Sequence, residues 1–288
     1  MSKKTPRVSV LTPIYNTNPE HLRAMIESIL NQTFTDFEFL ILNDSPDNTE
    51  IEKIVLDYAK RDKRIKYSKN DKNMGISLAR NKLLDMARGE YIAIMDHDDI
   101  SLPDRFEQQV DFLDKNQHIG IVSGWLEYYV DNKPTHKYWE TPEHNIDIKQ
   151  GLTQDSVVCH PATMMRRSLF VDNNIKYEPQ YSPCEDYLLW VRMLDKTGFY
   201  NMQKPLLLYR MHDNRTSVLY DDKMKMLSRD IAFQARSKFP AFYTELRRSD
   251  NANLTTFRLR IFGIPLLKIK NNKIYLFECL PIAKLKWK

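Results

Sequence analysis

The chain has 288 residues, of which 42% are hydrophobic and 11% aromatic, and its formal net charge is +5. These values are typical of a globular protein with a core, large enough for one domain and an extension. Three widely spaced cysteines indicate neither a disulfide framework nor a zinc site and suit a reducing compartment. No apolar run approaches the roughly 20 residues that span a bilayer. The N-terminal apolar stretch, broken by Pro13, is too short for a signal peptide.

The first hundred residues alternate between strand and helix patterns. Apolar strands are predicted at 8–12, 37–42, 65–68 and 91–95. The first helix begins with Asn18 as N-cap and Pro19 in the first turn. In the second helix, Thr49 and Glu52 have the spacing of a capping box, and the third helix ends at Gly89. This alternation predicts an α/β fold with a mostly parallel sheet and helices on both faces.

The second half of the chain is less regular. A helix is predicted at 102–116, a strand at 119–129, a helix from 185 to 198 and a short strand at 206–210. The polar and aromatic segment 133–153 has little periodicity and is interpreted as a loop. A further helix at 222–238 precedes a basic extension. We therefore predict a domain at 1–220, with a nucleotide-sugar half at about 1–100 and an acceptor half at about 101–220, followed by an extension at 221–288.

Polar residues follow several of the predicted strands. Tyr15 and Asp44 come just after the first two strands, and Asp96, Asp98 and Asp99 follow the strand at 91–95. Ligands of parallel α/β sheets bind beyond the carboxyl ends of the strands, so these side chains should share one edge. Clustered carboxylates repel one another, and a divalent cation such as Mg²⁺ or Mn²⁺ would relieve that repulsion. Taken alone, the cluster is more typical of a solvated acidic turn than of a metal site.

The last segment of the chain combines cations with apolar side chains. Residues 257–288 contain a single acid, Glu278, and eight basic residues, namely Arg258, Arg260, Lys268, Lys270, Lys273, Lys284, Lys286 and Lys288. Interleaved with them are residues such as Phe257, Leu259, Ile261 and Trp287. This combination favours an element that lies in an anionic membrane interface. A subdomain with a solvated basic face is the alternative, and nucleic-acid binding is not favoured because the basic residues are confined to the tail.

Six segments in order resemble glycosyltransferase family 2, whose members have the GT-A fold, a Rossmann-like sheet. The resemblance covers about residues 6–217. The segments are Val-Ser-Val-Leu-Thr-Pro-Ile-Tyr-Asn at 8–16, Leu-Ile-Leu-Asn-Asp-Ser at 40–45, Asn-Met-Gly-Ile-Ser-Leu-Ala-Arg-Asn at 73–81, Gly89 to Asp99, Glu-Asp-Tyr-Leu-Leu-Trp at 185–190 and Tyr-Arg-Met-His at 209–212.

The resemblance implies inverting transfer of a sugar from a nucleotide donor, usually a UDP-sugar, with Mn²⁺ or Mg²⁺. Tyr15, with Pro13 before it, would flank the base, Asp44 would accept a hydrogen bond from it, and Arg80 would hold the nucleotide. Asp96 would meet the ribose. Asp98 and His212 would bind the metal, and Asp186 or the adjacent Glu185 would be the catalytic base. His160 and Arg166 are weaker candidates for the acceptor side.

The sequence departs from the family pattern at one place. Residues 43–46 read Asn-Asp-Ser-Pro where the family usually has Asp-Asp-Gly-Ser, so the loop conformation is in question while Asp44 is kept. The Gln-x-x-Arg-Trp signature of processive members is not present, which favours transfer of one sugar at a time.

We therefore expect a glycosyltransferase that adds one sugar to a lipid-linked or surface glycan precursor, such as that of a lipopolysaccharide or capsule. It would act in the cytoplasm, peripherally on the membrane. The alternatives are a non-catalytic nucleotide-sugar-binding module and a nucleotidyltransferase on a similar sheet. The latter would be expected to have a Gly-rich basic phosphate loop after the first strand, and none occurs there. A dehydrogenase is excluded because no G-x-G-x-x-G occurs.

Overall fold

The computed structural model describes residues 5–212 and 215–242 in detail, and four later strands as backbone. The main-body strands are β1 (Val8–Ile14), β2 (Phe37–Asn43), β3 (Ile65–Lys69), β4 (Tyr91–Ile94), β5 (Ile100–Ser101), β6 (Ile119–Val130), β7 (Lys133–Trp139), β8 (Met164–Arg166) and β9 (Gly198–Arg210). The helices are α1 (Pro19–Leu30), α2 (Thr49–Arg61), α3 (Ile76–Met86), α4 (Arg105–Lys115), α5 (Asn145–Gly151), α6 (Ser168–Asn173), α7 (Glu185–Met193), α8 (Thr216–Leu219) and α9 (Asp221–Lys238). Short 3₁₀ turns are η1 (His160–Ala162), η2 (Pro179–Tyr181) and η3 (Pro240–Phe242).

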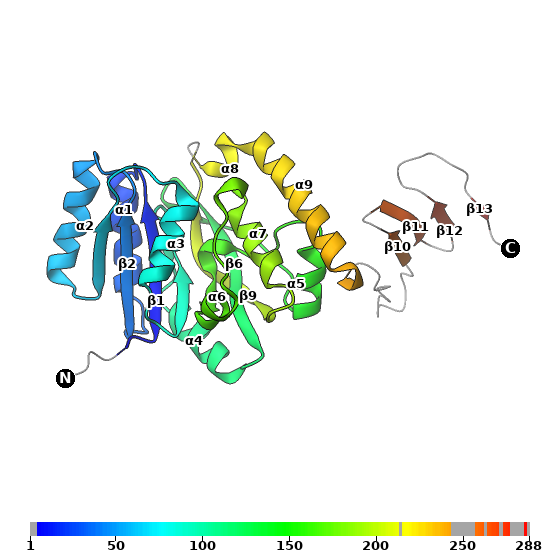
Figure 1. The fold of residues 1–288 in the computed structure, drawn as a ribbon, viewed down its shortest axis with the longest axis horizontal. Coiled ribbons are helices and arrows are strands. Elements are labelled where there is room, and N and C mark those ends of the chain that lie inside the picture. Colours follow the sequence, from blue (N-terminus) through cyan, green and yellow to red (C-terminus); the bar gives the residue numbers. More distant parts are fainter. Residues whose placement is uncertain are drawn as a thin grey trace.

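The main-body strands form one mixed sheet, with the order β3-β2-β1-β4-β8-β6-β9-β5 and β7 paired to β6 (Figure 1). Strands β3, β2, β1 and β4 are parallel to one another, as the alternating pattern predicts. Strand β8 is antiparallel to both β4 and β6. Strands β6 and β9 are again parallel. The predicted α/β class with a mostly parallel sheet is confirmed.

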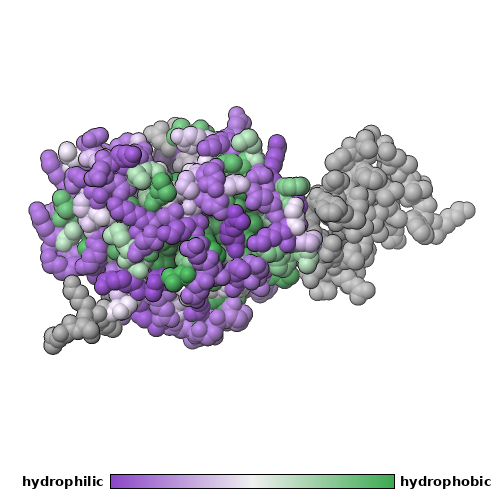
Figure 2. Space-filling model, in the orientation of Figure 1, coloured by the Kyte–Doolittle hydropathy of each residue, from purple (hydrophilic) through white to green (hydrophobic). Residues whose placement is uncertain are grey.

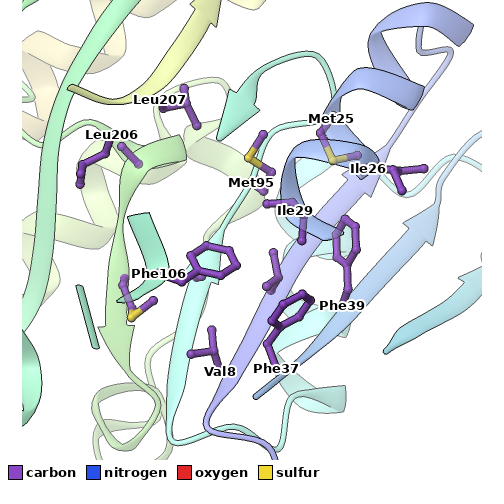
Figure 3. Packing of buried hydrophobic residues seen from close by; sticks show 14 of the residues in the cluster. Val8, Met25, Ile26, Ile29, Phe37, Phe39, Met95, Phe106, Leu206 and Leu207 are labelled. Carbon is purple, nitrogen blue, oxygen red and sulfur yellow. The ribbon is translucent and has the colours of Figure 1, made fainter. Parts of the chain in front are cut away.

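Two apolar layers cover the two faces of this sheet. One layer joins α1, α2 and α4 to strand residues such as Val10, and the other joins α3, α5, α6, α7 and α9 to residues such as Leu11. Successive side chains of a strand point to opposite faces, so one strand serves both layers. Figure 3 shows the first layer, where Met25 and Ile29 of α1 lie over Phe39 of β2. Strands buried on both faces explain the continuous apolar runs of the sequence.

Helix starts agree with the sequence in one case and differ in another. At α1 the Asn18 side chain accepts hydrogen bonds from the backbone of residues 20 and 21, as expected for an N-cap. At α2 the cap is Asn48, which accepts from the backbone N–H of Ile51 at 3.3 Å. Thr49 is already inside the helix, so the predicted capping box is wrong by one residue. An asparagine at the cap position competes effectively with threonine for this role.

The segment 133–153 is not the predicted loop. It forms β7, which pairs antiparallel with the end of β6, and then α5, whose Ile148 is buried. The hairpin turn at Asp131 and Asn132 places both residues at positive φ, 48° and 57°. Aspartate and asparagine tolerate this left-handed conformation better than most residues. Four residues of this strand, Lys133, Pro134, His136 and Lys137, are exposed, which explains its weak apolar pattern.

Helix α9 packs against α7 through Ile231, Ala232 and Ala235, which are buried. The division of the chain at residue 220 stays a prediction. Beyond it, β10 (Phe257–Ile261), β11 (Ile264–Lys270), β12 (Lys273–Leu276) and β13 (Leu285–Lys286) pair in that order. The side chains of the predicted basic extension lie outside the described residues. Hydrophilic residues cover most of the visible face of the main body (Figure 2). Among the helices described, none is both long and apolar enough to cross a bilayer.

Candidate active site

The first two strand ends lie side by side. Pro13 is buried inside β1, where it faces Leu42 of β2, and Tyr15 follows at the sheet edge with 48% of its surface exposed. The backbone N–H of Asp44 donates to Ile14 O at 2.9 Å, and that of Asn16 donates to Ser45 Oγ at 3.1 Å. These bonds lock the loops after β1 and β2 together. An exposed aromatic ring at such an edge is available for stacking on a nucleotide base.

Asp44 is buried and fixes the loop that follows β3. Its carboxylate accepts hydrogen bonds from Asn70 Nδ2 at 2.7 Å and from the backbone N–H groups of Met74 and Gly75, both at 2.9 Å. Gly75 has φ +82°, a conformation that favours glycine, and immediately precedes α3. Asp44 therefore shapes this loop, and both its oxygens already have partners within the protein.

Residues 43–46, which depart from the family pattern, form a turn that is closed by hydrogen bonds among these residues. Asn43 Oδ1 accepts from both the backbone N–H and the hydroxyl of Ser45, at 2.9 and 3.0 Å. Its amide nitrogen donates to the Tyr67 hydroxyl at 3.2 Å. An asparagine side chain that bonds to the backbone two residues later is a common turn device. The altered residues thus form an ordered loop.

Arg80 connects two acidic residues that are far apart in the sequence. Its Nη1 lies 2.6 Å from Glu185 Oε1, at the start of α7, and its Nη2 lies 3.0 Å from Asp96 Oδ1, just after β4. The side chains of Arg80 and Glu185 are only 7% and 6% exposed, whereas that of Asp96 is 29% exposed. Burial opposes the charge of Arg80, but Asp96 and Glu185 outweigh it and raise its pKa. A cation is therefore fixed between the two halves of the site.

The predicted metal ligands Asp98 and His212 are brought together. His212 Nε2 lies 2.8 Å from Asp98 Oδ2, although the residues are 114 positions apart. Burial acts to raise the pKa of Asp98, but His97 and His212 overcome it and lower this pKa to about 2. Asp98 is therefore an anion at neutral pH. His21 of α1 lies nearby, with its ring centroid 5.9 Å from that of His212, and sequence reasoning missed it. Its position in the first turn of the helix after β1 was the available signal.

Asp99 has a different role from its neighbours. It is 1% exposed, and its Oδ1 accepts from the backbone N–H of Arg210 at 2.9 Å. Burial and then the charges of Asp98 and Asp96 raise its pKa well above the usual range. The Arg210 side chain in turn donates to the backbone oxygen of Asp98 at 2.8 Å. Asp99 thus ties the acidic loop to the end of β9, which places His212 beside Asp98.

Asp186 has the properties of a base that operates near neutral pH. It is partly exposed, and its Oδ1 accepts from the backbone N–H of Tyr187 at 2.7 Å. Burial and then the charge of Glu185 raise the pKa of Asp186 to about 7, against the opposing influence of Arg80. A carboxylate of this pKa is a good proton acceptor at physiological pH.

The weaker acceptor-side candidates do not line the site in this way. Arg166 faces Tyr91 at the amino end of β4, and its Nη2 donates to Leu113 O at 2.6 Å. That end of the sheet is opposite to the acidic loop. His160 is buried, with its Nε2 2.9 Å from the Tyr177 hydroxyl. Burial and the nearby charges of two arginines lower the pKa of His160 well below its usual range, so it is neutral.

Asp98 and His212 are the side chains of this site that could hold a divalent metal. Within residues 5–212 and 215–242, no group of three or more His, Cys, Asp or Glu side chains is arranged to hold a metal ion. Asp98 and His212 supply an oxygen and a nitrogen donor at one point, both partly exposed. Mn²⁺ and Mg²⁺ accept carboxylate ligands, and a donor diphosphate supplies further oxygens. The pair therefore fits two ligands of a divalent metal whose remaining ligands would come from outside these side chains.

Comparison with known proteins identifies the family. The sequence model of "Glycosyl transferase family 2" matches residues 9–172, more than half of the chain. An uncharacterized glycosyltransferase of Methanocaldococcus jannaschii is 33% identical over 223 residues, covering 77% of this chain and 76% of that protein. A Bacillus subtilis glycosyltransferase that is named for teichuronic acid biosynthesis is 30% identical, covering 75% and 84%. The chain belongs to glycosyltransferase family 2 and is a glycosyltransferase.

Solved structures support the GT-A fold. The chain matches Staphylococcus aureus TarS, solved with UDP-GlcNAc, with a TM-score of 0.62 and 22% identity, covering 85% of this chain and 74% of that one. It also matches a mannosyltransferase of Pyrobaculum calidifontis, solved with GDP-Man and Mn²⁺, with a TM-score of 0.57 and 16% identity, covering 82% and 65%. At these identities the likeness shows the fold alone.

Proposed function

We propose that the protein transfers one sugar, with inversion, from a nucleotide donor to a hydroxyl of a lipid-linked or surface glycan precursor. The observation that carries this proposal is the arrangement around Arg80. On one side lies Asp96, next to the Asp98–His212 pair, and on the other lies Glu185, next to Asp186. Inverting transfer needs a base for the acceptor hydroxyl on one side and charge stabilisation of the departing diphosphate on the other. This arrangement provides groups suited to both roles.

Asp186 is proposed as the base. It takes the proton of the acceptor hydroxyl as the oxygen attacks the anomeric carbon, and the bond to the nucleotide diphosphate breaks on the opposite face. Arg80 and Asp96 hold the nucleotide, and Tyr15 flanks its base. Asp98 and His212 would hold Mn²⁺ or Mg²⁺, which supplies Lewis-acid stabilisation of the diphosphate. The raised pKa of Asp186 supports its assignment over Glu185, whose carboxylate is paired with Arg80.

The donor class is proposed from fold and family. A UDP-sugar is favoured, because the better-matching solved structure, TarS, was solved with UDP-GlcNAc, and GDP-mannose is the second choice from the other match. The test is a panel of UDP-, GDP- and dTDP-sugars with Mn²⁺, monitored for nucleotide release with and without acceptor. Release of UDP from at least one UDP-sugar is expected. Binding of a UDP-sugar without any turnover in the presence of suitable acceptors would instead favour a non-catalytic nucleotide-sugar-binding module.

Asp98→Ala tests the metal assignment. Because the substitution removes the oxygen donor beside His212, Mn²⁺-dependent binding of the UDP-sugar should be lost, while binding without metal should change little. Calorimetry with and without Mn²⁺ measures both. Asp111→Ala is a matched control, because Asp111 is exposed on α4, where it pairs with Lys115. Equal Mn²⁺ dependence in Asp98→Ala and the unaltered protein would contradict the assignment.

We also propose that the protein acts on the cytoplasmic face of a membrane, with its basic extension on the anionic lipid surface. The support is the sequence of residues 257–288, in which eight cations and one acid are interleaved with apolar residues. Removal of the residues after about Asn253 should release the protein from vesicles that contain anionic lipid. Sedimentation with vesicles measures this, and vesicles of neutral lipid alone are the control. Undiminished binding of the shortened protein would refute the role of the extension.

A further inference from the structure

Glu185 was a candidate for the base on sequence grounds, and its contacts point to another role. Glu185 Oε1 accepts a hydrogen bond from Arg80 Nη1 at 2.6 Å, while Nη2 of the same guanidinium donates to Asp96 Oδ1 at 3.0 Å. We infer that Glu185 is a positioning residue, which fixes Arg80 between the two halves of the site and sets the charge around Asp186. This inference rests on the proposed role of Asp186 as the base.

The guanidinium of Arg80 is supported from behind as well as at its two ends. Its central carbon lies 5.5 Å from the centre of the Tyr177 ring. Two hydrogen bonds join the backbone of Tyr177 to Asn81 of α3. The backbone N–H of Tyr177 donates to Asn81 Oδ1 and its backbone carbonyl oxygen accepts from Asn81 Nδ2, both at 2.8 Å. The Tyr177 hydroxyl also meets buried His160 at 2.9 Å. Arg80 can therefore change its position little while Glu185 remains in place.

The charges that face Asp186 come from several elements. Glu185 precedes it on α7, Arg80 comes from α3, and Asp96 comes from the loop after β4. The Tyr177 hydroxyl and the Cys184 thiol are also near, and burial raises the pKa of both well above the neutral range. At neutral pH the charge balance around Asp186 is therefore set by one cation and two carboxylates.

Removal of the Glu185 charge should change this balance in a predictable direction. One repelling anion disappears, so the attraction of Arg80 for Asp186 is no longer offset by Glu185. This change favours the ionised form of Asp186 and lowers its pKa. A charge at a distance of several ångströms inside a protein typically shifts a neighbouring pKa by about one unit or more. A residue with a merely structural role would leave this pKa unchanged.

The test is a pH titration of the full-length protein labelled with ¹³C at aspartate carboxyl carbons, observed by NMR without ligand. Asp186→Asn identifies the Asp186 signal. In Glu185→Gln the Asp186 midpoint should fall by about one pH unit. Glu178→Gln is the matched control, because Glu178 pairs with Arg192 of α7 at 2.9 Å, whereas Arg80 pairs with Glu185 and Asp96. Its Asp186 midpoint should not move.

A second variant keeps the inference testable if Glu185→Gln does not fold. Arg80→Gln removes the cation, so the Asp186 midpoint should rise. An unchanged midpoint in either folded variant would overturn the inference. Once a donor is known, Glu185→Gln should retain transfer at high pH with its pH profile shifted to lower pH. Loss of transfer at every pH, with Asp186 still titrating, would identify Glu185 as the base and would also overturn the inference that Glu185 is a positioning residue. The NMR titration needs no turnover, so a failure of the proposed function would be recognised separately.

Discussion

Three neighbouring aspartates of one acidic loop have three different surroundings. Asp96 meets Arg80, Asp98 meets His212, and Asp99 is buried against the backbone of Arg210. Their partners come from α3 and from the end of β9, far along the chain. Charge repulsion within the loop is thus relieved by different groups, and only Asp98 lies beside a second metal donor. A single acidic motif can therefore serve donor binding, metal binding and loop anchoring at once.

At the same scale, the raised pKa of Asp186 predicts the pH dependence of transfer. The base must be ionised, so the rate should rise with pH through about 7, where Asp186 loses its proton. Asp186→Asn should lower the transfer rate by roughly 10²- to 10⁴-fold and leave donor affinity nearly unchanged. Rates from pH 5 to 9 and calorimetry with the donor measure the two effects. Asp195→Asn, an exposed site beyond the end of α7, is the control. Full activity of Asp186→Asn would exclude Asp186 as the base.

The same pKa also makes a prediction about stability. Asp186 has a folded-state pKa of about 7 against an ordinary value of 3.8, so the folded protein binds its proton more tightly than the unfolded chain. Stability contributed by the protonated carboxyl is present below about pH 4 and is lost as pH rises to about 7. Asp186→Asn keeps a neutral group at all pH values. Its Tm should therefore exceed that of the unaltered protein at pH 8 and match it at pH 4, as calorimetric scans can show. A Tm gain of equal size at both pH values would contradict this linkage.

At the element scale, several site residues lie in the first turns of their helices. Helix α1 begins at Pro19, four residues after Tyr15, and presents His21 near His212, and Glu185 and Asp186 lie in the first turn of α7. Acidic residues in a first turn also complement the helix dipole, so the same residues favour the helix and serve the site. The local sequence thus fixes where each functional side chain leaves its helix.

The cap of α2 offers a direct test at this scale. Asn48→Ala removes the side-chain acceptor for the N–H of Ile51 and should cost about 1 kcal/mol of unfolding free energy. Thr49→Ala alters an exposed position inside the helix and should change stability by less than about 0.5 kcal/mol. Urea denaturation of both variants makes the comparison. A larger loss for Thr49→Ala would restore the capping box expected from the sequence.

At the scale of the whole molecule, the two halves of the sheet meet where β8 pairs with β4. Arg105 is fully buried at this junction, and its Nη2 donates to Ile94 O at 2.9 Å and to Thr163 O at 3.0 Å. Burial lowers the pKa of Arg105 to about 9, although Asp99 and Asp96 oppose the shift. One side chain thus binds the ends of both strands behind the acidic loop. The sequence offered no signal for this role.

Replacement of Arg105 should therefore weaken the junction. Arg105→Met leaves two buried carbonyl oxygens without this donor, so we expect a loss of about 2–4 kcal/mol in unfolding free energy. Arg61→Met is the control, because Arg61 is exposed and pairs with Asp57 on the helix surface. It should cost less than about 1 kcal/mol. Urea denaturation measures both, and equal stability of the two variants would show that Arg105 does not hold the halves together.

The sequence alone predicted the α/β class, the order of elements in the first half and the set of candidate site residues. These follow from local information, since strand and helix periodicity, caps and the positions of polar residues after strands are all encoded within short segments. It missed β7, because the strand has no buried residue and therefore a weak apolar pattern, and it placed the α2 cap one residue late. Where two adjacent residues could both serve, as with Glu185 and Asp186, it left the roles open.

Only the tertiary structure decided which residues meet. The contacts of Arg80 with Glu185, of His212 with Asp98 and of Arg105 with Thr163 join positions that are 105, 114 and 58 residues apart. Local propensity contains no information about such pairs, because they depend on the order of strands in the sheet. The tertiary structure also gives the two adjacent acids different properties. Glu185 is paired with a cation, whereas burial raises the pKa of Asp186 to about 7. The acidic residues of this glycosyltransferase site can therefore be recognised from the sequence, whereas tertiary packing determines their charges and their partners.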